Sequence, residues 1–151
     1  MELLRTFDAD RYEQALESWA WIDLEGKRPL FASPFGDMFL LAEDGVWVLD
    51  TLEGSLTHRW DSPDAMQADL ETPTGQDRYL LASLGRQAEA RGLVPAPTEV
   101  YDFTVPPILG GPLEVDNVVT SDFVVVVNIA GQLHEQLRDV PPGTKINIAL
   151  G

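Results

Sequence analysis

Three short apolar or alternating segments between residues 31 and 60 strongly constrain the fold of this sequence. These segments cover residues 36–42, 46–50 and 55–60. An Asp-Gly pair separates the first two and a Leu-Glu-Gly triplet separates the last two. Glycine-containing turns between β-branched or aromatic runs are strong hairpin signals. We therefore predict a three-stranded antiparallel meander over residues 31–60, preceded by a turn region over residues 24–30.

Helical patterns precede and follow the meander. The predicted helices cover residues 8–22, 62–71 and 75–91. Asp8 or Asp10 caps the first helix, and Ser62 caps the second ahead of a proline at the first helical position. Thr74 caps the third helix, in which apolar residues recur every four positions until Gly92 ends it. These helices offer apolar faces against which the meander can pack.

A rigid and then flexible corner comes later in the chain, with the sequence Pro-Pro-Ile-Leu-Gly-Gly. Pro106 and Pro107 fix two φ angles, whereas Gly110 and Gly111 permit positive φ. We predict that this structural corner turns a strand into the core; the alternative is that it lines a binding surface. The strands expected on either side cover residues 98–105 and 113–119.

The most apolar run of the chain follows and allows two interpretations. Four consecutive valines favour a strand within residues 122–130. Phe123 and Val126 instead begin a stripe at helical spacing, and Ser121 is a suitable helix cap. We predict a helix, which completes a strand, corner and helix unit over residues 98–138.

Length and composition indicate one packed domain. The 151 residues are 44% hydrophobic and include four tryptophans, as in globular domains. We predict a single α+β domain over residues 1–151, in which an antiparallel β-meander packs against several helices and residues 145–150 add a last edge strand. No window approaches the about 18 apolar residues of a membrane span, and the N-terminus lacks a signal-peptide core. We expect a cytoplasmic protein with no membrane partner.

Charge is the strongest global signal. The chain has 25 acidic and 10 basic residues, which gives a formal net charge of −15. Nucleic acid is excluded as a partner, because phosphate binding needs clustered cations. A basic protein partner would be attracted and its association accelerated. The alternative is that the acidity only maintains solubility.

No reaction centre is recognisable in the sequence. The chain has no cysteine, which excludes disulfides and thiolate chemistry, and it lacks a Gly-x-Ser-x-Gly elbow and a phosphate-binding glycine loop. His58 and His134 are the only histidines, and Arg138 stands where a zinc-binding His-Glu-x-x-His helix would need its second histidine. We expect no catalytic residue, metal or other cofactor, and we predict that His134 is a core or boundary histidine bonded to a carbonyl.

Several phrases of the chain, in their order and spacing, match a known family. They are PFGDMF (34–39), VLDTLEG (48–54), GQDRY (75–79), PPILGG (106–111), EVDN (114–117), GQLHEQ (131–136) and PPGTK (141–145). Through them the chain resembles the type VI secretion immunity proteins of the Tdi kind, a C-terminal domain family formerly of unknown function that occurs beside a GAD-like domain. It is more distantly similar to the SUKH group of immunity proteins. The sequence before the meander has room for one helix and not for a separate GAD-like domain.

The resemblance implies a SUKH-like fold and a cytoplasmic immunity protein. Such a protein binds and neutralises a cognate secreted toxin, typically a DNase, without catalysing a reaction. Neither the toxin nor the oligomeric state follows from the sequence. Two alternatives stay open, a non-catalytic small-ligand-binding or scaffold domain of the same fold and a hydrolase with paired carboxylates.

The implied partner is a basic, nuclease-like toxin. Carboxylates presented to its DNA-binding groove would speed association and occlude its active site. The candidate toxin-binding residues are acids beside the meander turns and the corner, with two tryptophans as anchors: Glu43, Asp44, Asp50, Glu53, Glu114, Asp116, Trp47 and Trp60. For each acid the alternative is a solvated turn, and for the tryptophans it is core packing.

Overall fold

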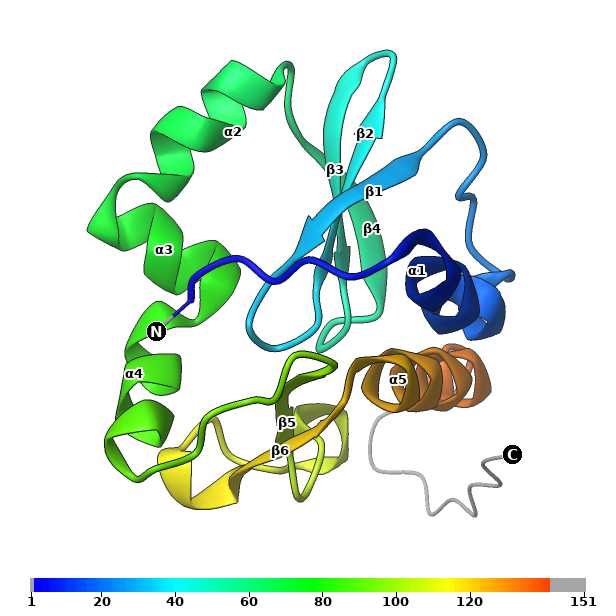
Figure 1. The fold of residues 1–151 in the computed structure, drawn as a ribbon. Helices are drawn as coiled ribbons and strands as arrows, with labels where there is room; N and C mark the ends of the chain where they lie inside the picture. Colours follow the sequence, from blue (N-terminus) through cyan, green and yellow to red (C-terminus); the bar gives the residue numbers. More distant parts are fainter. Residues whose placement is uncertain (1, 142–151) are drawn as a thin grey trace.

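The computed structural model describes residues 2–141 and has an α+β fold, as predicted. A four-stranded antiparallel sheet stands between two groups of helices, and a two-stranded antiparallel sheet lies below it in Figure 1. In chain order the elements are α1 (Ala9–Leu16), the 3-10 turn η1 (Glu17–Trp19), β1 (Arg28–Ala32), β2 (Met38–Ala42), β3 (Gly45–Asp50), β4 (Ser55–Trp60), α2 (Pro63–Leu70), α3 (Pro73–Leu80), α4 (Ala82–Ala90), β5 (Glu99–Phe103), η2 (Pro107–Leu109), η3 (Val115–Asn117), β6 (Val118–Asp122) and α5 (Phe123–Leu137).

The predicted meander forms strands β2, β3 and β4 of a sheet with the order β1-β2-β3-β4. The predicted turn over residues 24–30 is wrong at its end, because β1 begins at Arg28 and pairs with β2. Pro29 conceals this strand, since proline lacks the N–H of a sheet ladder and commonly marks a turn. The register shifts between Pro29 and Phe31. The edge position of β1 explains why a segment with a proline still forms a strand.

The four-stranded sheet is apolar on both faces. On one face, Leu40 and Leu49 join a core with α1 and α5. On the other face, Phe39 and Val48 join a core with α2 and α3. Residues 31–40 are buried without interruption, including the whole turn between β1 and β2. The sheet is therefore the middle layer of the molecule, with α1 and α5 on one side and α2 and α3 on the other (Figure 1).

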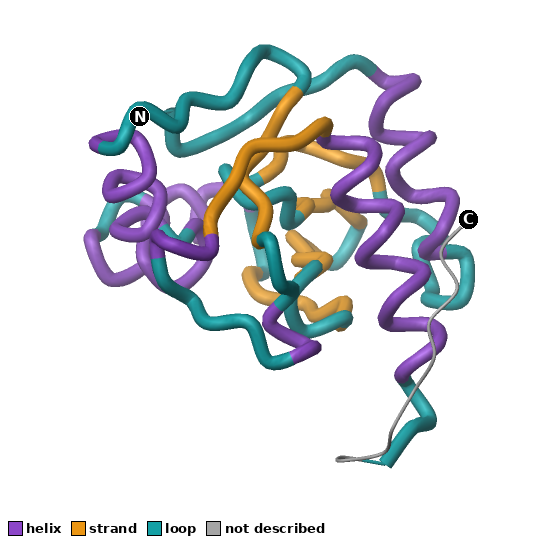
Figure 2. The backbone as a smooth tube through the Cα atoms, turned by 90° about the horizontal axis from the view of Figure 1, so that it is seen from below, coloured by secondary structure: helices purple, strands orange, loops and turns teal. Residues whose placement is uncertain are grey.

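Helices α1 and α5 come from opposite ends of the described chain and run side by side (Figure 2). The indole Nε1 of Trp19 donates to Val127 O at 2.9 Å. A Cβ at Gly131 would lie 2.4 Å from Ser18 Oγ, so the glycine lets the two segments approach closely. Gly131 therefore has a packing role that offsets its low helix propensity.

Side-chain caps fix where four helices begin, and Thr72 is the cap of α3. Asp8 caps α1 and Ser62 caps α2, each by accepting a backbone N–H three residues later, as predicted. Asp122, and not the predicted Ser121, caps α5. The first predicted helix is shorter than expected, because the 3-10 turn Glu17–Trp19 replaces its second half.

The predicted third helix is two helices, α3 and α4, because Leu81 adopts a left-handed φ of 50° between them. Asp77 Oδ1 accepts the N–H and the hydroxyl of Ser83 at 2.8 and 2.6 Å, and so stabilises the start of α4. Helix α3 begins after Thr72, two residues before the predicted Thr74 cap. The apolar spacing continues across the break, which is why the sequence predicted a single helix.

The valine-rich run forms helix α5 and not a strand. Phe123 and Val127 are fully buried in the core shared with α1 and the sheet, so tertiary packing overrides the β propensity of valine. The strand predicted over residues 113–119 is displaced to β6, because the preceding 3-10 turn η3 occupies much of that range. The strand predicted over residues 145–150 lies outside the described residues.

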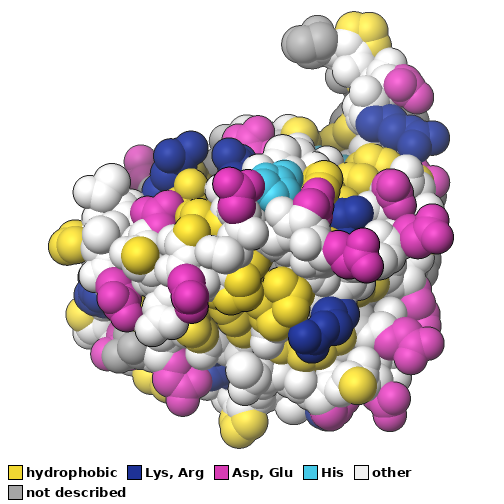
Figure 3. All heavy atoms as spheres, turned by 90° about the horizontal axis from the view of Figure 1, so that it is seen from above, with side chains coloured by type: hydrophobic (Ala, Val, Ile, Leu, Met, Phe, Trp, Pro, Cys, Tyr) yellow, Lys and Arg dark blue, Asp and Glu magenta, His cyan; other side chains and the backbone are white. Residues whose placement is uncertain are grey.

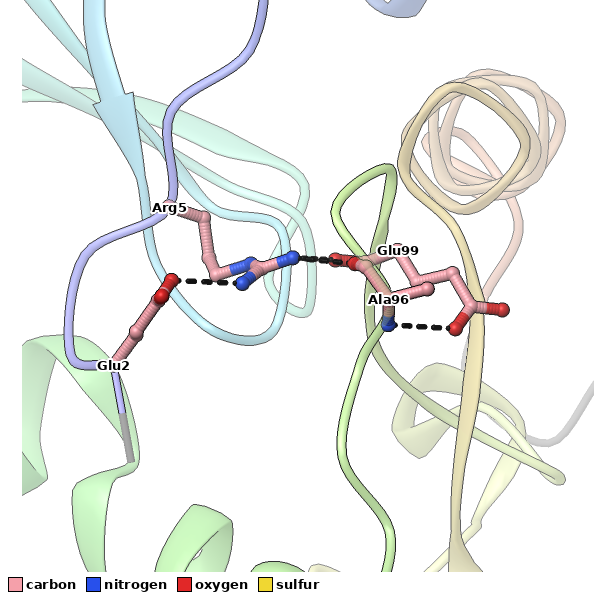
Figure 4. Close-up of polar contacts among 4 residues, drawn as sticks. All are labelled: Glu2, Arg5, Ala96 and Glu99. Carbon is pink, nitrogen blue, oxygen red and sulfur yellow. Dashed lines mark hydrogen bonds and ion pairs between the residues drawn. The ribbon is translucent and has the colours of Figure 1, made fainter.

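Arg5 fastens the N-terminal segment to two distant parts of the chain (Figure 4). Its backbone N–H and C=O pair with Ala32 at 2.8 and 2.7 Å. Its guanidinium donates to Ala96 O at 2.6 Å and to Glu99 O at 2.8 Å, and it pairs with Glu2 at 2.9 Å. The Arg5 side chain is 11% exposed, so these bonds are largely shielded from water.

Replacing Arg5 with alanine should lower the free energy of unfolding by about 1–3 kcal/mol, because two carbonyls lose a charged donor. Arg5→Lys is the matched control: it keeps the charge but cannot reproduce the forked geometry, so we expect an intermediate loss. Urea unfolding followed by tryptophan fluorescence measures both variants. An alanine variant as stable as the native chain would contradict this role for Arg5.

Candidate functional site

A small cavity of about 60 Å³ lies where the β5–β6 connection meets α5 and the β3–β4 turn. Its apolar walls include Phe35, Leu52, Pro107, Ile108, Ile129 and Leu133, which come from four separate parts of the sequence. Asp102 of β5, Thr51 and His134 of α5 add polar groups. We call this space the corner cavity.

The corner beside this cavity is fixed by its own backbone. The 3-10 turn Pro107–Leu109 is followed by Gly110 with a φ of 93°. Gly111 has no room for a side chain, because a Cβ there would lie 1.7 Å from Val105 O. Asn117 closes the loop, donating from Nδ2 to Val105 O at 2.8 Å and accepting the Val105 N–H at 2.9 Å. These contacts hold the corner in one geometry.

Thr51 connects three parts of the fold beside the corner cavity. Its N–H and its hydroxyl both donate to Asp37 Oδ1, at 2.8 and 2.7 Å. Its carbonyl lies 2.7 Å from His134 Nε2, and because a carbonyl only accepts, Nε2 carries the proton. His134 is therefore the core histidine bonded to a carbonyl that the sequence predicted. All three residues are buried.

Asp37 is a buried acid that the sequence gave no reason to single out. Burial raises the pKa of Asp37 to about 7, and the neighbouring charge of Asp50 contributes in the same direction. The hydrogen bonds from Thr51 favour the ionised form and oppose this shift. Its sequence context, Phe-Gly-Asp, is that of an ordinary surface turn. Only the burial of the whole β1–β2 turn makes this position unusual.

Gly54 packs directly against the ring of His134. The glycine has a φ of 70°, and a Cβ there would lie 2.4 Å from His134 Nδ1. The β3–β4 turn and α5 are therefore in contact at a position where only glycine fits without a shift of the ring.

The candidate acids of the meander lie at opposite ends of the sheet, because consecutive turns of an antiparallel meander alternate between its ends. Glu43 and Asp44 are exposed on the β2–β3 turn. Asp50 and Glu53 lie at the β3–β4 turn, where Asp50 Oδ1 accepts the N–H groups of Leu52 and Glu53 at 2.9 and 3.0 Å. Asp50 thus shapes its own turn.

Glu114 and Asp116 lie in a third place, on the loop between the corner and β6. Both are exposed, and Asp116 forms an ion pair with Arg91 at the end of α4. The view in Figure 3 shows acidic side chains spread among basic and apolar ones on the face that it displays. The six candidate acids therefore do not form one acidic face.

Trp60 is a core residue. It is 7% exposed, its Nε1 donates to Asp69 Oδ2 at 3.0 Å, and its ring centroid lies 4.7 Å from that of Tyr79. The expectation of an exposed anchor at this position is wrong, because the second core, against α2 and α3, covers the ring.

Trp47 is half-buried at the sheet end that carries the β2–β3 turn. Its Nε1 donates to Asp44 Oδ1 at 2.8 Å, and this bond lowers the pKa of Asp44. Lys27 Nζ lies 4.4 Å from the centroid of the Trp47 ring, and His58 meets the ring edge-on. The ring is thus held in one orientation while part of it stays accessible.

Exposed apolar side chains gather around the corner and α5. Within residues 2–141, the large apolar side chains that are more than a third exposed are Leu4, Val94, Val105, Ile108, Leu109, Leu113, Val119, Val125 and Ile129. Ile108 and Ile129 both border the corner cavity, and Val125 lies one helical turn before Ile129. We call the surface of Ile108, Leu109, Val125 and Ile129, together with the cavity, the corner face. Exposed apolar surface beside a cavity makes the corner face a candidate partner site.

Asp102 is the acid of the corner face, and it was missed in the sequence. It is half-buried on β5 and lines the corner cavity. Burial raises the pKa of Asp102, and a hydrogen bond from the Phe103 N–H partly opposes the shift. Among the described residues no basic side chain forms an ion pair with it. A lone acid between Tyr101 and Phe103 resembles the solvent side of an ordinary strand, so alternation alone could not identify it.

Four of the phrases that carry the family resemblance meet at the corner cavity. They contribute Phe35, Leu52, Pro107 and His134 to its walls. Phrases that are far apart in the sequence therefore describe one place in the structure.

Residues 2–141 contain no group of three or more histidine or acidic side chains placed to hold a metal ion. Within the same residues, every helix is too short or too polar to cross a bilayer.

Fold and site together define an α+β protein with an exposed apolar face around a small cavity. Residues 64–134 match the family model of the T6SS immunity protein Tdi1, C-terminal. The resemblance to type VI secretion immunity proteins is thereby confirmed, and the matched stretch includes the corner and most of α5. No curated protein matches the chain.

A solved structure supports the fold. The crystal structure of Atu4351 from Agrobacterium tumefaciens superposes with a TM-score of 0.53 at 21% sequence identity and covers 86% of this chain. The chain spans 66% of the length of that protein. At this identity the likeness establishes the fold.

Asp37→Asn should flatten the pH dependence of stability between about pH 4 and pH 7. The folded state holds a proton on Asp37 in this range and the unfolded state does not, so the native chain loses stability as the pH rises, by up to about 1.4 kcal/mol per unit. Asparagine can still accept both hydrogen bonds from Thr51. Denaturant unfolding of the two proteins at several pH values measures this difference in their stability. Parallel curves would show that Asp37 does not titrate in this range.

Gly54→Ala should destabilise the protein more than Gly26→Ala does. Both glycines have a φ near 70°, but a Cβ at Gly26 meets nothing within 4 Å. The Gly26→Ala variant therefore measures the cost of the backbone strain alone. In a His134→Ala background the cost at Gly54 should fall by about 1 kcal/mol or more, because the colliding ring is gone. A double-mutant cycle of unfolding free energies measures the coupling. Additive effects would rule out the contact between Gly54 and His134.

Proposed function

We propose that this chain is a cytoplasmic immunity protein that binds a cognate secreted toxin and neutralises it without catalysing a reaction. The match of residues 64–134 to the Tdi1 immunity family is the observation that carries the proposal. The toxin is proposed to be basic and nuclease-like, since an acidic inhibitor complements a protein surface that binds phosphate.

The surplus of negative charge supports this partner. The formal net charge is −15, and few of the carboxylates are neutralised locally: among the described residues, arginines form ion pairs with Glu2, Asp8, Asp116 and Asp139. The remaining excess produces a long-range field. Such a field steers an oppositely charged partner and raises its association rate.

The six candidate acids contribute to this steering from three sides of the molecule, and not as one contact surface. Asp44 and Trp47 are directly linked, because the indole donates to the carboxylate of Asp44. We keep Trp47 as a proposed anchor, since aromatic side chains held in one orientation lose little entropy on binding. Trp60 is no longer an anchor candidate.

The corner cavity favours neither of the two alternative functions. The corner cavity, at about 60 Å³, is well below the roughly 300–1,000 Å³ of typical small-molecule sites. A carboxylate-based hydrolase needs two carboxyl groups beside the substrate, and Asp102 is the only acid among the residues that line this cavity.

The test is binding to the secreted polypeptide encoded beside this chain, using its C-terminal domain with the nuclease activity removed by mutation. We expect a stable complex whose association rate falls about tenfold or more between 50 and 500 mM salt, with a smaller change in dissociation. Surface plasmon resonance at several salt concentrations measures both rates. An absence of binding at low salt would reject the proposed function, and salt-independent association would reject the electrostatic part of it.

A further inference from the structure

The corner face combines an apolar rim, a narrow cavity and a half-buried carboxylate. Ile108 and Ile129 stand at the rim with 43% and 37% of their surface exposed. Asp102 lines the same cavity from β5. A ligand that fits here must therefore satisfy apolar walls and a negative charge within a few ångströms of each other.

The size of the cavity restricts what can enter. An apolar cavity of about 150 Å³ accepts a benzene ring, whereas the corner cavity measures about 60 Å³. An aromatic side chain is therefore excluded unless the walls move, and the corner is held firmly by Asn117 and the close contact at Gly111. An unbranched aliphatic stem matches the available width.

The charges around the cavity are negative. Besides Asp102, Glu53 is exposed next to the lining residue Leu52, and Asp122 caps α5 one turn before Val125. No lysine or arginine lines the cavity, and the Nε2 of its one histidine, His134, is bonded to the carbonyl of Thr51. The local field therefore favours a cation.

We propose that the corner cavity receives one lysine or arginine side chain of the toxin, with its methylene stem between Ile108 and Ile129 and its charged group on Asp102. This inference rests on the proposed function, because the occupant belongs to the toxin. Long basic side chains bury their stems on apolar surface while the charged end finds a polar partner, which is the pairing that this cavity offers.

The energetic reason lies in the state of Asp102 before binding. Burial has already removed part of the water around its carboxyl, and no described basic residue compensates for that loss. A cation from the partner therefore meets a carboxylate whose desolvation is partly complete. Removing one partner of a buried ion pair raises mainly the dissociation rate of the complex. Removing an exposed charge at the rim changes mainly the association rate.

The test compares Asp102→Asn with Glu13→Gln, using the same inactivated C-terminal domain of the neighbouring secreted polypeptide. Both substitutions remove one negative charge, but Glu13 is exposed on α1 and away from the corner cavity. We expect Asp102→Asn to weaken binding by about 30-fold or more, chiefly through dissociation, and Glu13→Gln by less than about threefold, chiefly through association. Thermal unfolding shows that both variants are folded.

A second arm identifies the side chain on the toxin. Each lysine and arginine of the domain is replaced by alanine in turn and measured against native, Asp102→Asn and Ile108→Ala proteins. At one toxin position, the alanine substitution should cause no further loss of affinity in the Asp102→Asn background. At the other positions, the losses of binding free energy from the two substitutions should add. Equal effects of Asp102→Asn and Glu13→Gln, or additivity at every position, would overturn the inference and leave the proposed function standing. Failure of the native chain to bind would reject both.

Discussion

The hydrogen bonds of Thr51 hold the four-stranded sheet and helix α5 together. Its N–H and hydroxyl go to Asp37 in the buried β1–β2 turn, and its carbonyl goes to His134 on α5. These groups are shielded from water, so each bond that is lost would leave a buried polar atom unsatisfied at a cost of about 1–3 kcal/mol. Because Gly54 admits the ring of His134, the same turn also fixes α5 against the sheet. The corner cavity lies directly beside this connection, and its shape follows from it.

The distribution of charge changes how an acidic inhibitor of this size would work. The candidate acids stand at both ends of the sheet and on the loop before β6, so the molecule has a negative field without one negative face. In the proposed complex the dispersed carboxylates would attract the partner at a distance, and the corner face would supply the shape and the apolar surface of the contact. Asp102 belongs to both the charged and the apolar part of the surface, since it is an acid that is partly removed from water.

Local patterns predicted the parts of the fold that local physics controls. The meander followed from its turn glycines and alternation, and α5 followed from its apolar spacing although valine favours strands. Pro29 concealed β1, because proline is compatible only with an edge strand and the local sequence does not reveal which strand will lie at the edge of the sheet. Leu81 concealed the break between α3 and α4, since its left-handed backbone has no signal in the sequence. The site depended even more on distant contacts: Asp37 and Asp102 resemble ordinary surface acids until the rest of the chain covers them.

The pairing of α1 with α5 has a consequence for how the protein is made. Trp19 finds the partner for its indole at Val127, which leaves the ribosome more than 100 residues later. The apolar face of the meander that these helices cover therefore stays uncovered until α5 has been synthesised, and contacts of such long sequence separation slow folding. The walls of the corner cavity form only once α5 has packed, since α5 supplies one side of them. A nascent chain therefore lacks the corner cavity until α5 has been synthesised.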